Sequence, residues 1–191
     1  MKILLSNGHP DAERYIKALT NAYVAGAQMN QHELELININ ELKFDLNLQF
    51  GYRKRTELEP DLIRAQELIQ WANHIVWLYP VWWGSYPAIM KGFLDRVLLP
   101  GFAFKKREGS VWWDKYLKGK TSRIICTMDQ PPWYYRWVNK RPSHVAMKKL
   151  TLNFIGIQKV KVTAIGPIRL STDEFRKQWL DKVRLLGEQG R

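Results

Sequence analysis

Short apolar runs alternate with longer amphipathic stretches along the whole chain. This alternation is typical of a parallel sheet covered by helices, because consecutive parallel strands need a crossover between them. The runs that predict strands are residues 2–6, 33–39, 74–79, 122–127 and 159–165. The stretches with helical spacing begin near residue 11 and then cover residues 60–72, 86–98, 143–154 and 172–186. A length of 191 residues fits one α/β domain, residues 1–191, better than two.

Two long segments interrupt the alternation. Residues 42–59 are irregular and polar, which is long for a loop, so we expect them to be functional or to contact a partner. Residues 128–141 form a second excursion, between the fourth strand and the helix after it. The second excursion begins where a parallel strand ends, and ligands of open α/β sheets bind at such places.

The net charge of +12 lies entirely in the second half of the chain. Residues 1–100 hold 10 Lys and Arg against 11 Asp and Glu, which leaves 20 against 7 for residues 101–191. Such a field attracts polyanions, whether a phosphorylated cofactor, an anionic lipid surface or nucleic acid. A solubilising surface explains the charge equally well. No helix-turn-helix, zinc finger or RNA-binding aromatic signature occurs, so we expect no specific nucleic-acid partner.

Several other classes of site are excluded or disfavoured. The single cysteine, Cys126, excludes an internal disulfide, and it is expected to be a packed thiol because it ends an apolar strand. The four histidines are scattered, so a metal site is not expected. Residues 118–121, KGKT, resemble the end of a phosphate-binding loop but precede a strand, and no G-x-G-x-x-G occurs. No apolar run reaches bilayer length and no signal-peptide pattern is present, so we expect a cytoplasmic protein.

The ligand site is expected beyond the carboxyl ends of the strands, as in other open α/β sheets. Four segments lie there: residues 6–11, the polar run after residue 39, residues 80–85, and residues 128–141. The first leads into a helix N-terminus, whose free N–H groups suit a phosphate. The last two are rich in aromatic side chains. Flat apolar surfaces beside an anion site suggest a ligand with a planar ring and a negatively charged tail.

These motifs resemble a known family. The stretch YPVWWGSYPAIMKGFLDRVLLPGFAF, residues 79–104, is similar to the cofactor-binding segment of the flavodoxin-like NAD(P)H:quinone oxidoreductases, which include drug-activity modulator B and the ancillary proteins of glutathione-gated potassium efflux. GHPD at residues 8–11 and LKGK at residues 117–120 extend the resemblance over most of the chain. It implies a three-layer sandwich with five parallel strands in the order 2-1-3-4-5, a flavin cofactor, FMN or FAD, NAD(P)H as co-substrate, and a homodimer.

The resemblance also implies the residues of the site. An isoalloxazine ring needs a flat apolar support and backbone donors, which the turn after the third strand can supply. His9 and the first residues of the first helix take the places that bind the phosphate. The residues that follow the fourth strand form the remaining side of the site. The implied flavin-binding residues are His9, Asp11, Arg14, Tyr15, Ile16, Pro80, Val81, Trp82, Trp83, Gly84, Thr127, Met128 and Asp129.

The chain departs from the family in two places. Arg14, Tyr15 and Ile16 replace the usual serine, aromatic residue and asparagine, and arginine can still hold a phosphate. After the fourth strand, the usual threonine and paired glycines are replaced, and the tyrosine and histidine that stabilise reduced flavin in some members have no clear counterpart. Tyr134 and Tyr135 are the candidate catalytic substitutes.

The cluster at residues 133–137 is the candidate substrate surface, with Trp133 and Arg136 as its contacts. A dimer surface, a substrate lid and a patch that meets a membrane remain open for this cluster. The implied reaction is a two-electron, ping-pong hydride transfer from NAD(P)H through the flavin to a quinone or similar acceptor. The alternative is a flavin-binding regulatory subunit that docks on a membrane transporter, with peripheral contact to a membrane protein or anionic lipid.

Overall fold

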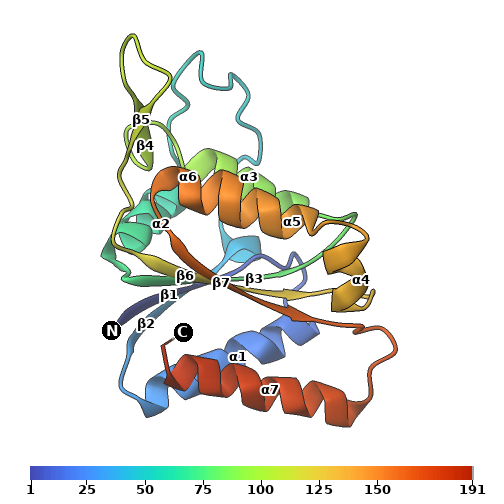
Figure 1. Ribbon diagram of the computed structural model, residues 1–191. Helices are drawn as coiled ribbons and strands as arrows, with labels where there is room; N and C mark the ends of the chain where they lie inside the picture. The colour runs from blue at the N-terminus through green and yellow to red at the C-terminus, as the bar shows by residue number, and fades with distance from the viewer. Residues whose placement is uncertain (191) are drawn as a thin grey trace.

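A computed structural model describes residues 1–190 and contains a five-stranded, all-parallel sheet (Figure 1). The strands follow the spatial order β2-β1-β3-β6-β7. This is the predicted order 2-1-3-4-5, because β4 and β5 belong to a separate two-stranded hairpin and only shift the numbering. The five strands are β1 (Lys2–Asn7), β2 (Glu33–Asn38), β3 (His74–Pro80), β6 (Thr121–Thr127) and β7 (Lys159–Ile165).

Helices cover both faces of the sheet (Figure 1). One face carries α1 (Tyr15–Met29) and α7 (Asp173–Glu188), which lie side by side. The other carries α2 (Pro60–Trp71), α3 (Ala88–Val97) and a continuous helical run made of α5 (Pro142–His144), the π-helix η2 (Val145–Leu152) and α6 (Asn153–Ile155). Each face has its own buried apolar cluster. The remaining elements are η1 (Ile39–Glu41), β4 (Phe104–Lys106), β5 (Trp113–Lys115) and α4 (Pro132–Trp137).

The central strand β3 explains why its sequence reads as an unbroken apolar run. All of its residues are buried, because the strand is covered on both faces. Trp77 and Tyr79 pack into the cluster beneath α2 and α3, whereas Val76 and Leu78 pack beneath α1 and α7. The alternation of side chains along a strand therefore feeds two cores at once.

Glycine lets α1 and α7 approach closely. A Cβ atom on Gly26 of α1 would overlap the backbone carbonyl of Arg184 in α7, and one on Gly187 would overlap the carbonyl of Tyr23. Only residues without a side chain allow the two backbones to meet at this distance. The acidic start predicted for the last helix is present, and the hydroxyl of Thr172 accepts a hydrogen bond from Phe175 N at 3.2 Å.

Several predicted boundaries were wrong. The first helix begins at Tyr15, not near residue 11, because the Asp11 side chain accepts a hydrogen bond from Glu13 N at 2.9 Å and holds residues 11–14 in turns. The excursion at residues 128–141 contains the short helix α4, and most of the helix predicted at residues 143–154 is the π-helix η2. The hairpin of β4 and β5 was not predicted, since each strand has only three residues.

The long segment at residues 42–59 is attached to the domain by Arg96 of α3. This side chain is 1% exposed, and its guanidinium donates to Asp45 O at 2.6 Å and to Glu57 O at 3.0 Å. It also donates to the carboxylate of Glu59 at 2.8 Å. A buried cation is stable only when such acceptors surround it. One residue therefore holds both ends of the segment.

Candidate functional site

A crevice of about 510 Å³ lies at the carboxyl ends of the central strands. Residues that follow β1, β3, β6 and β7 meet there, as expected for an open α/β sheet. Ten of the residues predicted to bind flavin line it, which are His9, Arg14, Tyr15, Ile16, Pro80, Val81, Trp82, Thr127, Met128 and Asp129. The other three predicted residues, Asp11, Trp83 and Gly84, lie outside its lining.

The loop after β1 orients His9 toward the crevice. His9 N donates to the Asn7 side chain at 3.0 Å, and His9 Nδ1 accepts a hydrogen bond from Asp11 N at 2.9 Å. Because burial lowers the pKa of His9, the ring stays neutral near pH 7. An accepting Nδ1 assigns the proton to Nε2, which is then a donor. The ring meets Trp82 edge to face, with 5.5 Å between centroids.

Positive groups converge at one end of the crevice. The helix α1 has no acidic residue in its first turn and no side-chain cap, so its N-terminus keeps free N–H groups. Arg14, Arg169 and Arg176 line the crevice beside it. Arg176 donates to the Ser171 hydroxyl at 2.8 Å and lies over the Tyr15 ring, 5.9 Å from its centroid. This end is suited to a phosphate.

The turn after β3 forms the apolar side of the crevice. Trp82 and Ser85 exchange backbone hydrogen bonds, Trp82 N to Ser85 O at 2.8 Å and Ser85 N to Trp82 O at 2.9 Å. This tight turn requires positive φ at Trp83 (50°) and Gly84 (77°). Trp83 is consequently turned fully into solvent, whereas Trp82 is half-buried against His9.

Tyr135 fixes this turn from beneath. The side chain is fully buried, and its hydroxyl donates to Gly84 O, 3.0 Å away. It accepts a hydrogen bond from Ser143 N at 2.8 Å and lies 2.8 Å from the Ser143 hydroxyl. Tyr135 thus connects helix α4, the start of α5 and the turn at residues 82–85. A buried hydroxyl with three partners orders the groups around it.

The other residues of α4 point outward. Trp133 and Tyr134 are exposed, and the Arg136 guanidinium stacks on the Trp137 ring at 4.8 Å from its centroid. None of them lines the crevice. The predicted catalytic role of Tyr134 and Tyr135, and the predicted substrate contacts of Trp133 and Arg136, therefore stay predictions.

Cys126 is buried, as predicted. Its thiol lies 3.1 Å from His144 Nε2, and burial raises the thiol pKa to about 12. Burial together with the nearby Arg141 lowers the pKa of His144 to about 4. Both groups are neutral near pH 7, so the thiol is not an activated nucleophile. Within residues 1–190, no cluster of His, Cys, Asp and Glu has the geometry to hold a metal ion.

Sequence reasoning missed one side of the crevice. Glu13, Ile168, Arg169 and Arg176 also line it. Three of these follow β7, whose carboxyl end obeys the same positional rule as the other strands. Arg169 and Arg176, which follow the GP at residues 166–167, were the sequence feature that could have identified this side of the crevice.

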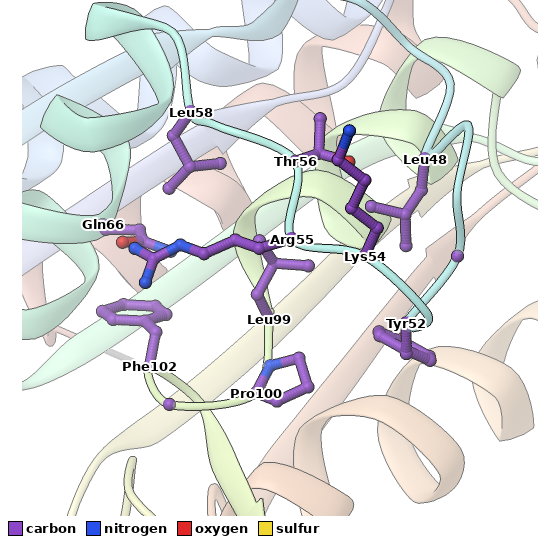
Figure 2. Close-up of a pocket in the computed structure, with 12 residues that line it drawn as sticks. Leu48, Tyr52, Lys54, Arg55, Thr56, Leu58, Gln66, Leu99, Pro100 and Phe102 are labelled. Atoms are coloured by element: carbon purple, nitrogen blue, oxygen red, sulfur yellow. The ribbon is translucent and has the colours of Figure 1, made fainter.

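A second cavity, of about 470 Å³, separates the 42–59 segment from the loop at residues 99–102. Figure 2 shows the Arg55 side chain extending toward Gln66 and Phe102, with Tyr52 on the opposite side. This cavity shares no residue with the crevice.

None of the helices described here combines the length and apolarity that a bilayer span requires.

Comparisons with known proteins agree with this architecture. Residues 1–185 match the family described as having a flavodoxin-like fold. The chain is 30% identical to an NAD(P)H oxidoreductase of Haemophilus influenzae over 188 residues, which is 95% of this chain and 91% of that protein.

Two solved structures share the fold. The NAD(P)H:quinone oxidoreductase of Methanothermobacter marburgensis superimposes with a TM-score of 0.80 at 19% identity, covering 99% of this chain and 95% of that one. An FMN-dependent NADH-azoreductase of Bacillus anthracis, solved with FMN, gives 0.77 at 18% identity, covering 99% of both chains. Identities this low show a common fold.

Proposed function

Since the chain belongs to the flavodoxin-like fold family, we propose that it is a flavin-dependent NAD(P)H:quinone oxidoreductase. One observation carries the proposal. Segments after β1, β3 and β6, selected from sequence as flavin-binding, line a single crevice with an apolar side and a cationic end. The NAD(P)H oxidoreductase of Haemophilus influenzae supports the proposed activity.

The residues of the crevice fit a flavin, as FMN or FAD. A volume of about 510 Å³ lies within the range of ligand pockets, roughly 300–1,000 Å³. Pro80, Val81 and Trp82 offer apolar surface for a planar ring. The three arginines and the N-terminus of α1 would hold the phosphate. When bound, the flavin would carry two electrons from NAD(P)H to a quinone or similar acceptor in a ping-pong cycle.

The chain would supply donors to the negative charge that reduction places on the ring. Met128 N and Trp82 N are already bonded, to Ile165 O and Ser85 O. The N–H group of Asp129, which lines the crevice, makes no hydrogen bond within the described chain, so it remains for a ligand. The N–H groups of Trp83 and Gly84 are also unbonded there but lie outside the lining. The Nε2–H of His9 is a further donor at the crevice.

We assign Tyr134 and Tyr135 different roles in this scheme. Tyr135 is buried and would act on the turn through Gly84, not on the substrate. Tyr134, with Trp133 and Arg136, is exposed on the helix that follows the crevice strand β6, and would contact the acceptor. We also propose a homodimer, which the exposed aromatic rings of Trp83, Trp133 and Trp137 support. No observation supports the alternative of a docking subunit.

The test is to purify the protein, extract its cofactor, and measure NADPH and NADH oxidation with menadione. We expect bound FMN or FAD and steady turnover. Arg169→Gln should weaken flavin binding by about tenfold, since it removes a charge-assisted phosphate contact. Lys177→Gln removes the same charge from the exposed face of α7 and should leave flavin affinity unchanged. A folded preparation that neither retains added flavin nor oxidises NAD(P)H would refute the proposal.

A further inference from the structure

Another cavity, distinct from the crevice and from the cavity beside the 42–59 segment, lies at the edge of the sheet. This basic groove, of about 570 Å³, runs between the edge strand β7 and the helical run that begins at α5. Six of its nine lining residues are basic, and none is acidic. They come from three parts of the chain and are Arg123, Arg141, His144, Lys148, Lys149 and Lys161.

Most cations in the groove lack a carboxylate partner. Arg141, Lys148, Lys149 and Lys161 form no ion pair with any residue from 1 to 190. Elsewhere on the surface, cations such as Lys91 pair with a neighbouring acid. Like charges gathered in one concave site repel each other and focus a positive potential there. An anion in the groove would remove that repulsion.

His144 adds a neutral donor to these charges. The Cys126 thiol stays protonated near pH 7 and lies 3.1 Å from His144 Nε2, so the S–H can donate to this nitrogen. The imidazole proton is then on Nδ1. Nδ1 has no hydrogen-bond partner in the part of the chain that the structure describes. The groove therefore offers an N–H donor as well as ammonium and guanidinium groups.

The shape of the groove favours a small ligand over a macromolecule. Its volume is that of a small-molecule site. The cations Arg141, Lys148 and Lys149 lie together on one short helical run, whereas a nucleic-acid surface needs a track of charges along the backbone. Lysines at positions 159 and 161 of β7 also discourage a peptide from adding as a further strand.

We propose that the basic groove binds a small polyvalent anion of the phosphate class, either inorganic polyphosphate or the phosphate chain of a nucleotide. Arg141, Lys148 and Lys149, all from the helical run, neutralise the ligand, whereas Lys161 lies between Val160 and Val162 on β7 and its side chain leaves the strand on the opposite face. Val145, Val160 and Val162 give the groove an apolar surface for the rest of a nucleotide. The groove shares no lining residue with the crevice, so this proposal stands apart from the flavin-dependent activity.

The test is calorimetric titration of the purified protein with tripolyphosphate and, separately, with ATP, at constant ionic strength. We expect saturable binding of one ligand per chain. Lys148→Gln with Lys149→Gln should weaken it by about tenfold or more, because two charge-assisted contacts are lost. Lys177→Gln with Lys182→Gln removes two charges from α7 and should change the affinity less than twofold, roughly the scatter between independent surface sites.

Three results would overturn the proposal. The first is no saturable binding of either probe. The second is equal weakening in both double variants, which would show a general response to net charge. The third is binding that survives Lys148→Gln with Lys149→Gln but disappears in Arg14→Gln with Arg169→Gln, which would locate the anion in the crevice. Near-UV circular dichroism of each variant verifies that the fold is intact.

Discussion

The hydroxyl of Tyr135 is expected to set the stability of the turn at residues 82–85. Tyr135→Phe removes one oxygen and leaves the ring in place, so no large cavity forms. It deprives the buried Ser143 N–H of its acceptor and Gly84 O of a donor. An unsatisfied buried donor costs about 1–3 kcal/mol, and a lost hydrogen bond about 0.5–1.5 kcal/mol. The free energy of unfolding should fall by about 2–4 kcal/mol.

Urea unfolding followed by tryptophan fluorescence measures this change. Tyr134→Phe is the matched control, because it removes the same group from the adjacent, exposed side chain. The control should change the unfolding free energy by no more than about 0.5 kcal/mol. Flavin retention, measured separately, should fall only in Tyr135→Phe. A loss below about 1 kcal/mol in Tyr135→Phe would mean that the hydroxyl does not secure the turn, since even one orphaned buried donor costs that much.

Three further predictions concern the fold. His74 has a pKa of about 4 in the folded protein against 6.5 ordinarily, because it is buried. The neutral His74 ring therefore makes its full contribution to the free energy of unfolding above pH 6.5. About 3 kcal/mol of this free energy should be lost as the pH falls from 6.5 to 4, measured by urea titration at each pH. Arg96→Met should cost at least about 2 kcal/mol and open the 42–59 segment to trypsin, whereas the exposed Arg64→Met should do neither. Gly26→Ala should lower the thermal midpoint, since overpacking costs about 1–3 kcal/mol, and an unchanged midpoint would contradict the close contact of α1 and α7.

The sheet could be predicted from sequence because its signal is local. The buried strand β3 reads as a continuous apolar run, and β7 was placed with its observed bounds. Crossover connections then leave few topologies for five such strands. The crevice followed from the same reasoning, since its position depends only on where the strands end.

Two parts of the site depend on contacts distant in sequence, and these could not be predicted. Tyr135 and Gly84 are 51 positions apart, so nothing in the local pattern distinguishes Tyr135 from Tyr134. Arg176 reaches the crevice because α7 packs along α1, and Arg169 because its N–H donates to the Asp129 carboxylate at 3.1 Å. Side-chain burial in α4 is likewise decided by the neighbours of a six-residue helix and not by its periodicity.

One short stretch connects the crevice with the basic groove. Residues 141–144 give Arg141 and His144 to the groove, while Ser143 between them binds the Tyr135 hydroxyl that holds Gly84. An anion in the groove affects the turn only if it binds one arrangement of this stretch more tightly than another. Tyr135→Phe cuts the connection and leaves every groove cation in place. Anion affinity that is unchanged in this variant while flavin retention falls would show two independent sites, and a joint loss would show coupling through Ser143.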